Sequence, residues 1–175
     1  MQYFDFFKLP VSFILDETAL RRQYYANSKR FHPDFYSLEP AEKQAWALEQ
    51  STLNNQAYTT LSDPDKRMQY ILQQKGLLGD EQKQAAMPPS FLMEMMDINE
   101  AIMDLQLEMD AQRWEKTVRQ VQEMEDQLTQ SIQPILERYQ DQGDQTADLE
   151  EVKFFFLKKR YLLRIKENLF TFAPA

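Results

Sequence analysis

Apolar residues recur every three or four positions along most of the chain, the spacing that places them on one face of an α-helix. In the first part of the sequence this pattern predicts helices over residues 3–9, 18–31, 40–61 and 65–74. Pro40 suits the first turn of the long third helix, because its fixed φ angle is helical and its missing N–H would be unpaired there anyway. We therefore expect two antiparallel helices framed by two short ones.

Three longer helical patterns follow, over residues 90–110, 112–139 and 148–172, and Pro134 is expected to kink the second of them. Because each apolar stripe must be buried against its neighbours, three helices joined by short turns predict an antiparallel bundle. Two glycines and two prolines in residues 75–89 mark a connection between the two parts. The sequence thus predicts an all-α protein with an N-terminal domain at residues 1–74, a linker at 75–88 and a three-helix bundle at 89–175.

Composition narrows the chemistry that the chain can perform. Its 175 residues include three glycines, one histidine and no cysteine. A disulfide framework and a thiolate zinc site are thus excluded, and we expect no metal site and no cofactor. The N-terminus has no basic segment followed by an apolar run, and no stretch approaches 18 uncharged apolar residues. A cytoplasmic protein that does not enter membranes is expected.

Negative charge is concentrated in the second part of the chain. Residues 1–75 hold 9 Lys or Arg against 9 Asp or Glu, whereas residues 76–175 hold 11 against 19, which accounts for the net charge of −8. A surface of that sign repels phosphate backbones, so nucleic acid is not an expected partner. A basic or polar protein surface fits it better.

The tripeptide His32-Pro33-Asp34 separates the second and third helical patterns. Proline disfavours helical geometry in the residue before it and lacks a backbone donor, so a loop is expected here, with the three side chains at its tip. By itself the tripeptide is equally consistent with a plain turn whose Asp caps a helix. The helix before it carries basic residues on its outer face, at Arg22, Lys29 and Arg30.

Further residues form a pattern with this tripeptide: Tyr3-Phe4-Asp5-Phe6-Phe7, Leu9-Pro10, Tyr24, Phe31, Asn54, Ala57-Tyr58, Leu61, Asp63-Pro64, Arg67 and Tyr70. Together they make the first 75 positions resemble a J domain, the ATPase-stimulating module of DnaJ-type co-chaperones. The resemblance implies that His32, Pro33 and Asp34, with Arg22, Lys29 and Arg30, dock on a DnaK-type chaperone and accelerate its ATP hydrolysis. Phe35 replaces the Lys or Arg that is frequent in the family, which favours a dedicated chaperone as partner.

The helix expected at residues 90–110 is apolar beyond one stripe. At 100° per residue, five side chains point within about 40° of Phe91 and should form the core: Met95, Ile98, Ile102, Leu105 and Met109. Other apolar and acidic side chains lie farther round: Leu92, Met93, Met96, Asp97, Glu100, Met103 and Asp104. There is no Lys or Arg between residues 89 and 110. This face suits the binding of a protein, but Leu92, Met96 and Met103 pack equally well on the third helix, and both alternatives stay open.

A second resemblance rests on Phe91-Leu92-Met93-Glu94 and the residues that follow this segment. It is similar to the client-binding helix of HscB, the J-type co-chaperone family of iron-sulfur cluster assembly, and with the N-terminal part covers almost the whole chain. The resemblance implies an HscA/DnaK-type ATPase chaperone and an IscU-type iron-sulfur scaffold protein as partners. The scaffold-binding positions that it implies are Leu92, Met93, Met96, Asp97, Glu100, Asp104 and Phe156, with Phe154 and Phe155 adjacent in the same helix.

The expected activity is the coupling of two partners, with no catalytic residues in this chain. Carboxylates such as Glu100 and Asp104 suit acid–base or di-metal chemistry in principle, but the Glu-x-x-His pattern and a second histidine are missing. Two further alternatives stay open: a general DnaJ-like co-chaperone or holdase that binds unfolded proteins through the Met-rich helix, and a purely structural helical adaptor.

Overall fold

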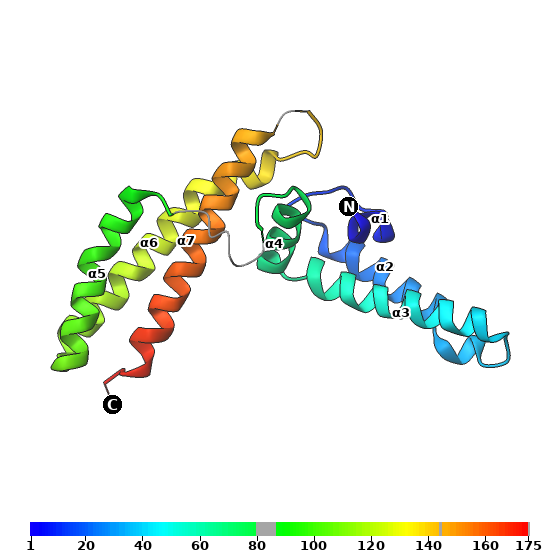
Figure 1. Ribbon diagram of the computed structural model, residues 1–175, viewed down its shortest axis with the longest axis horizontal. Coiled ribbons are helices and arrows are strands. Elements are labelled where there is room, and N and C mark those ends of the chain that lie inside the picture. The colour runs from blue at the N-terminus through cyan, green and yellow to red at the C-terminus, as the bar shows by residue number, and fades with distance from the viewer. Residues whose placement is uncertain (80–86, 144, 175) are drawn as a thin grey trace. The chain divides into compact units, whose positions relative to one another are not determined.

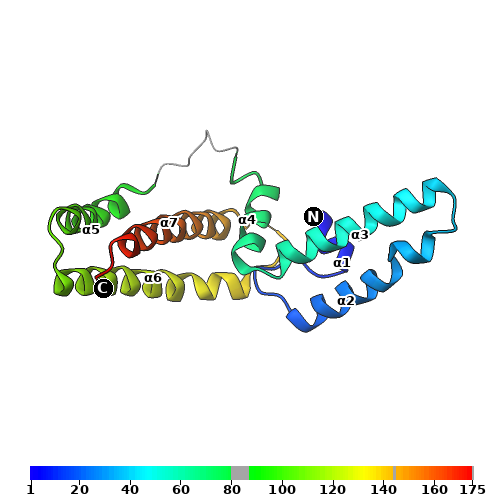
Figure 2. The same cartoon turned by 90° about the horizontal axis from the view of Figure 1, so that it is seen from below.

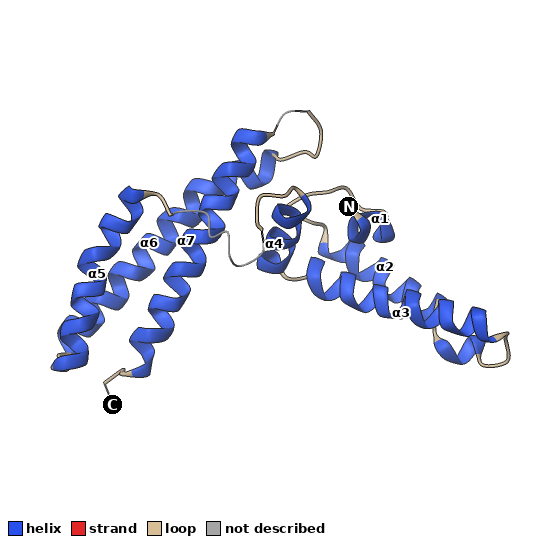
Figure 3. Cartoon of the chain, viewed as in Figure 1, coloured by secondary structure: helices blue, strands red, loops and turns tan. Residues whose placement is uncertain are grey.

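The computed structural model describes residues 1–79, 87–143 and 145–174, and these residues form helices and connecting loops without any strand (Figures 1 and 3). The elements are α1 (Gln2–Phe7), α2 (Glu17–Arg30), the 3-10 helix η1 (Pro33–Tyr36), α3 (Ala41–Leu61), α4 (Pro64–Gln74), α5 (Pro89–Leu107), α6 (Ala111–Arg138) and α7 (Thr146–Thr171). The prediction of an all-α protein is confirmed. No helix among the described residues has the length and apolar character that crossing a bilayer requires.

The chain forms two units. The first comprises Met1–Gly76 together with Tyr139–Gln145, and the second comprises Leu77–Arg138 and Thr146–Ala175. Half of the linker predicted at residues 75–88, namely residues 80–86, lies outside the described residues. The domain boundaries predicted from the sequence did not assign Tyr139–Gln145 to the first unit.

Two aspartates start helices of the first unit in the same way. The Asp16 carboxylate accepts hydrogen bonds from the backbone N–H groups of Thr18 (2.9 Å) and Ala19 (3.0 Å), which begins α2. Asp63 does the same for α4, where Pro64 takes the first helical position. Each cap satisfies backbone donors that the first turn of a helix leaves unpaired.

The α2–α3 hairpin is held together by a buried amide as well as by apolar contacts. Asn54 of α3 is 1% exposed, and its Nδ2 donates to the backbone oxygen of Tyr24 (3.2 Å) and to Ser28 Oγ (2.9 Å) in α2. One turn along, the rings of Tyr24 and Tyr58 stack with centroids 4.1 Å apart. The two bonds from Nδ2 fix the register of the helices, whereas Asn54 Oδ1 is buried without a hydrogen-bond partner among the described residues.

Arg67 of α4 joins three segments of the first unit. Its side chain is buried, and it donates from Nε to the backbone oxygen of Phe13 (2.9 Å) and from Nη1 to that of Leu61 (2.6 Å). Burial lowers the pKa of the guanidinium, and the nearby carboxylates of Glu17 and Asp63 oppose this. The guanidinium therefore ties the segment before α2 and the end of α3 to α4.

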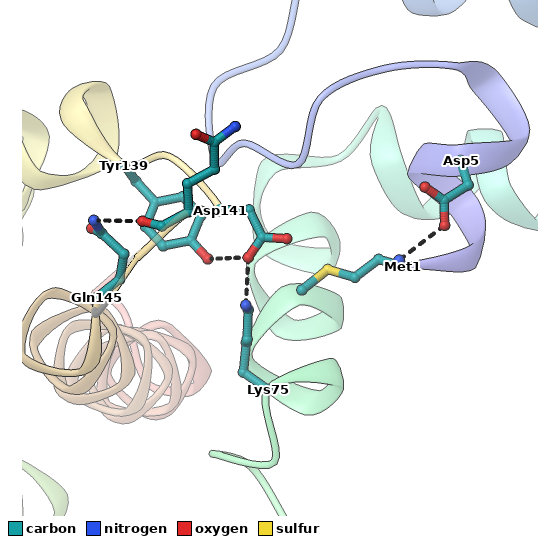
Figure 4. Close-up of polar contacts among 7 residues, drawn as sticks. Met1, Asp5, Lys75, Tyr139, Asp141 and Gln145 are labelled. Atoms are coloured by element: carbon teal, nitrogen blue, oxygen red, sulfur yellow. Dashed lines mark hydrogen bonds and ion pairs between the residues drawn. The ribbon is translucent and has the colours of Figure 1, made fainter.

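The segment Tyr139–Gln145 completes the first unit (Figure 4). The Tyr139 ring is buried with its centroid 4.7 Å from that of Phe13, and its hydroxyl donates to Asp141 Oδ1 (3.3 Å). Lys75 Nζ donates to the same carboxylate oxygen. Burial, together with the negative charge of Asp141, raises the pKa of Tyr139 to about 12.

The second unit consists of the helices α5, α6 and α7 (Figure 2). They enclose a core cluster of nine buried side chains: Phe91, Met95, Ile98, Ile102, Leu105, Val121, Leu162, Ile165 and Leu169. The core stripe predicted for α5 is confirmed at four of its five positions. Met109 is the exception, at 41% exposed, because α5 ends at Leu107 and the next residue, Glu108, is extended. The third helix is tied to the second by Trp114 Nε1, which donates to the backbone oxygen of Leu169 (2.9 Å).

The junction of α6 and α7 carries a two-pronged ion pair. Arg138, at the end of α6, donates from Nε (3.1 Å) and Nη2 (2.5 Å) to the two carboxylate oxygens of Asp148 in the first turn of α7. The hydrogen bonds from Arg138 lower the pKa of Asp148 below its usual value. Pro134 lies inside α6, which continues past it to Arg138.

Candidate functional site

The structure offers two candidate surfaces, one on each unit. The first is the loop between α2 and α3, which lies at the end of their hairpin away from α1 and α4 (Figure 1). Phe31 closes α2 and anchors this loop: it is 5% exposed, and its ring centroid lies 5.4 Å from that of Trp46 in α3. The chain then leaves the hairpin interior at His32.

His32, Pro33 and Asp34 are all exposed, as the loop prediction requires. Pro33 begins η1, a short 3-10 turn that the sequence reasoning did not anticipate. The His32 side chain is 54% exposed and that of Asp34 is 85% exposed, so both polar groups reach solvent. Phe35 is 67% exposed and places its ring edge-on to the imidazole, with centroids 5.9 Å apart.

Hydrogen bonds between residues close together in the sequence order this exposed loop. The backbone N–H of Asp34 donates to His32 Nδ1 (3.3 Å), and the same ring nitrogen lies 3.6 Å from Asp34 Oδ2. Ser37 Oγ donates to the backbone oxygen of Asp34 (2.9 Å), and the Tyr36 hydroxyl donates to that of Arg30 (3.1 Å). These contacts order the loop while the side chains of His32 and Asp34 stay exposed to solvent.

The basic residues predicted to assist this loop lie on the exposed side of α2. Arg22, Lys29 and Arg30 are exposed, and within the described parts of the chain none of the three forms an ion pair with a carboxylate. Arg30 lies over the Phe31 ring, with Cζ 5.1 Å from the centroid. The positive charges of α2 are therefore available to an acidic partner.

The second surface is the outer side of α5. Leu92, Met93, Met96 and Met103 are 44%, 69%, 67% and 64% exposed. The alternative in which Leu92, Met96 and Met103 are sealed against the third helix is therefore wrong. Asp97 and Glu100 beside them are exposed as well. We call Leu92, Met93, Met96, Asp97 and Glu100 the α5 face.

Asp104 differs from the other two predicted acids of α5. Its carboxylate is half-buried and accepts a hydrogen bond from Arg113 Nη2 at 2.5 Å, across the turn between α5 and α6. The backbone N–H of Arg113 in turn donates to Asp110 Oδ1 (3.0 Å). Part of the charge of Asp104 is therefore neutralised within the chain by a pair that spans this turn. No spacing in the sequence marks that pair.

Phe156 does not fit the scaffold-contacting role that the resemblance implied. Its ring is 2% exposed, and the guanidinium Cζ of Arg160 lies 5.7 Å from its centroid. Val152 lies one turn earlier and is fully buried, so both residues are on the core side of α7. Of the three adjacent phenylalanines, Phe154 alone is more than marginally exposed; it is half-buried, with Lys153 Nζ 5.5 Å from its centroid.

No group of three or more His, Asp or Glu side chains is placed to hold a metal ion in the described ranges. The described residues instead combine an exposed loop beside a basic helix with an exposed apolar and acidic helix face. Both arrangements are suited to binding other proteins.

Comparison with known protein families divides the chain in a similar way. The DnaJ domain matches residues 2–70, and the HSCB C-terminal oligomerisation domain matches residues 87–169. The first of these families covers the exposed loop and the basic helix α2. The second covers the α5 face.

Individual relatives match over different lengths. The co-chaperone protein HscB homolog of Psychromonas ingrahamii is 32% identical over 97% of this chain and 99% of its own length. The iron-sulfur cluster co-chaperone protein HscB of Mus musculus is 32% identical over 95% of this chain and 67% of its own length. A Vibrio cholerae homolog is 38% identical over 58% of this chain, and that match spans 60% of the homolog.

The fold of a solved relative agrees with these matches. The structure of chaperone HscB from Vibrio cholerae superposes with a TM-score of 0.73 at 26% sequence identity, covering 97% of this chain and 96% of the other. The similarity therefore extends over both units.

Proposed function

Because the chain belongs to the HscB family of J-domain co-chaperones, we propose that it delivers an IscU-type iron-sulfur scaffold protein to an HscA/DnaK-type chaperone and stimulates that chaperone's ATPase. The observation that best supports this proposal is the presence of two exposed, chemically different surfaces on two separate units. One surface is basic and polar, and the other is apolar and acidic. Two such surfaces suit two partners that are bound at the same time.

The chaperone would contact the loop at His32–Asp34 together with the cations of α2. Their positive charge complements an acidic surface, and the ordered loop adds a polar tip with a fixed shape. ATP hydrolysis would be carried out by the chaperone alone. By binding one conformation of the chaperone better than the other, the loop would shift its equilibrium toward the hydrolysing state.

The scaffold protein would cover the α5 face. Burying an exposed Leu or Met side chain stabilises a complex by roughly 1.5 to 3 kcal/mol, so Leu92, Met93 and Met96 are sufficient to supply most of a moderate affinity. Asp97 and Glu100 would orient the partner and increase its rate of association, because their charges remain in water at the rim of the contact.

Coupling follows from the covalent connection of the two units. A scaffold protein held on the second unit has a high effective concentration near any chaperone held on the first. The co-chaperone would therefore raise the probability that the chaperone encloses this client when hydrolysis traps it. The mechanism requires both surfaces and no reacting group in the chain itself.

Two variants separate the contributions of these surfaces. We expect His32→Gln to abolish ATPase stimulation of an HscA-type chaperone and to leave the affinity for the scaffold protein unchanged. We expect Leu92→Ala combined with Met96→Ala to weaken scaffold binding and to leave stimulation in the absence of scaffold unchanged. ATP turnover and calorimetric titration measure the two activities. Leu163→Ala on α7 is a matched control, because that side chain is 53% exposed and lies outside the α5 face.

An equal loss of both activities in either variant, with helical content intact by circular dichroism, would count against this division. The exposed thioethers of α5 also suit a holdase that binds unfolded proteins broadly. Competition distinguishes the two functions. A reduced, unfolded protein should not displace the folded scaffold from the α5 face. If the unfolded protein displaces the scaffold at equal concentration, the holdase is favoured.

A further inference from the structure

The exposed apolar strip of α5 continues beyond the α5 face. Met103 is 64% exposed and Leu107 is 87% exposed, and both lie in the C-terminal half of the helix. At 100° per residue, Met96, Met103 and Leu107 all point within about 60° of Leu92. Leu92 and Leu107 are 15 positions apart, a rise of about 22 Å at 1.5 Å per residue. The strip therefore runs almost the full length of α5.

Met103 and Leu107 are largely exposed and lie outside the buried core of the second unit. The side chains that pack on its core from the periphery include Trp114, Val118 and Tyr161, and neither Met103 nor Leu107 is among them. Asn99, which lies between Met96 and Met103 on the same side, donates from Nδ2 to the Tyr161 hydroxyl (3.1 Å) and so marks where α5 meets α7. Asn99 interrupts the strip, but exposed apolar side chains repeated along one side of a helix and flanked by polar groups suit an interaction site.

The end of the strip is held in place. The Asp104–Arg113 ion pair links the last turn of α5 to the first turn of α6, and the backbone oxygen of Asp104 accepts a hydrogen bond from the N–H of Glu108 (2.9 Å). These contacts keep Leu107 in helical geometry. A partner would therefore meet an ordered surface and would not have to fix this turn on binding.

From these observations we propose that Met103 and Leu107 are a second half of the scaffold-binding surface, so that the scaffold protein covers α5 to its C-terminal end. This inference rests on the proposed function and extends it to residues that the family resemblance did not assign.

Charge identifies the occupant as a protein with apolar and basic residues. Glu100 lies beside the strip on the helix, and residues 89–110 contain no Lys or Arg. At its C-terminal end Leu107 lines a shallow hollow with three acids, Asp104, Glu108 and Asp110, and with Arg113, which is paired with Asp104. A second copy of this chain that packed the same strip against it would bring carboxylates against carboxylates, which costs affinity. A client with basic residues around an apolar patch is complementary over the whole length.

The test is a calorimetric titration of the intact chain with a purified IscU-type scaffold protein. Met103→Ser combined with Leu107→Ser should weaken the affinity by about tenfold to a hundredfold, since two apolar side chains lose their burial. Both side chains are exposed in the free chain, so the variant should fold normally, which circular dichroism and urea unfolding check. Leu163→Ser, at a similarly exposed position on α7, is the control and should leave the affinity unchanged.

Leu92→Ser combined with Met96→Ser is measured in parallel to separate this inference from the proposed function. If only that pair weakens binding, the extension to Met103 and Leu107 is wrong and the α5 face stands. If only the Met103 and Leu107 pair weakens binding, the extension stands and the assignment of the α5 face fails. If neither pair changes the affinity, both are wrong. A Met103 and Leu107 variant that abolishes self-association in sedimentation, at unchanged scaffold affinity, would assign the strip to a second copy and overturn the inference.

Discussion

Arg67→Met should destabilise the first unit by about 2 to 4 kcal/mol, although it removes a charge whose burial is itself unfavourable. The side chain is 5% exposed and makes hydrogen bonds of 2.9 and 2.6 Å to the backbone oxygens of Phe13 and Leu61. Hydrogen bonds from a charged donor contribute about 1.5 to 3 kcal/mol each, and the substitution leaves both carbonyls unpaired. Methionine keeps most of the apolar stem and avoids the desolvation that lowers the pKa of the guanidinium. These gains explain why the expected loss of stability is smaller than the summed contribution of the two hydrogen bonds.

The two tryptophans of the chain allow this loss to be assigned to one unit. Trp46 belongs to the first unit and Trp114 to the second. In a Trp114→Phe background, urea unfolding followed by fluorescence reports Trp46 alone. Arg67→Met should shift the midpoint to lower urea with an unchanged slope. Arg67→Lys, which keeps the charge but offers a single point donor in place of the fork, should show an intermediate loss.

If the unfolding free energies of Arg67→Met and its parent agree within about 0.5 kcal/mol, the role of Arg67 is refuted, because that is the range of an ordinary surface substitution. The complementary Trp46→Phe background provides a second check. The transition reported there by Trp114 should be the same with Arg67 and with Met at this position. An equal shift in both backgrounds would show that the contribution of Arg67 is not local to the first unit.

Three further outcomes follow from contacts in the structure. Asn54→Ala removes two hydrogen bonds between α3 and α2 and should lower the stability of the first unit by about 1 to 3 kcal/mol in the same Trp46 assay; a change below about 0.5 kcal/mol would contradict the role of this amide. The folded pKa of Tyr139 is raised to about 12, above the ordinary value of 10.0, so its contribution to stability is complete below pH 10 and is lost as the pH rises toward 12. Burial also raises the pKa of Tyr70, so phenolate absorbance should show late titration from both residues, and Tyr139→Phe should remove the later part of it and part of the alkaline destabilisation; an unchanged titration would exclude Tyr139 as a source. Since Arg138 lowers the folded pKa of Asp148, the stabilisation by this pair is present above the unfolded value of 3.8 and is lost as the pH falls through the folded pKa. In the Trp46→Phe background, Trp114 fluorescence reports the unfolding free energy of the second unit. Asp148→Asn should make this free energy fall less steeply at acidic pH, and an unchanged steepness would contradict the assignment to this pair.

Local signals in the sequence were enough to predict the helices. Apolar periodicity, Pro40 and the glycine and proline cluster at residues 75–89 are effects of near neighbours, and the helix bounds agree within a few residues. Features that the sequence did not predict depend on contacts between distant positions. The return of Tyr139–Gln145 to the first unit requires Phe13 and Lys75 as partners, and no periodicity encodes that pairing.

The candidate surfaces were only partly predictable for a related reason. The proline in the loop indicated exposure of His32 and Asp34, because a turn at a hairpin end has nothing to cover it. A helical wheel, in contrast, shows which side chains share a face and does not show which neighbouring helix covers that face. The wheel could not show whether Met103 packs on α7 or faces solvent. Met109 is exposed because α5 ends at Leu107, before this residue.

The burial of Phe156 and the exposure of Met103 and Leu107 are connected in the proposed function. A fully buried aromatic ring in a complex contributes 150 to 250 Å² of contact, and in this chain that area is already used inside the bundle. A scaffold protein that binds the second unit would therefore obtain its apolar contact from α5 itself. The two extra side chains at the C-terminal end of α5 supply a comparable area on a helix that carries the required acidic flank. Affinity for the scaffold would then depend on the length of the α5 strip more than on a ring contributed by α7, and Phe154→Ala should weaken scaffold binding less than Met103→Ser combined with Leu107→Ser.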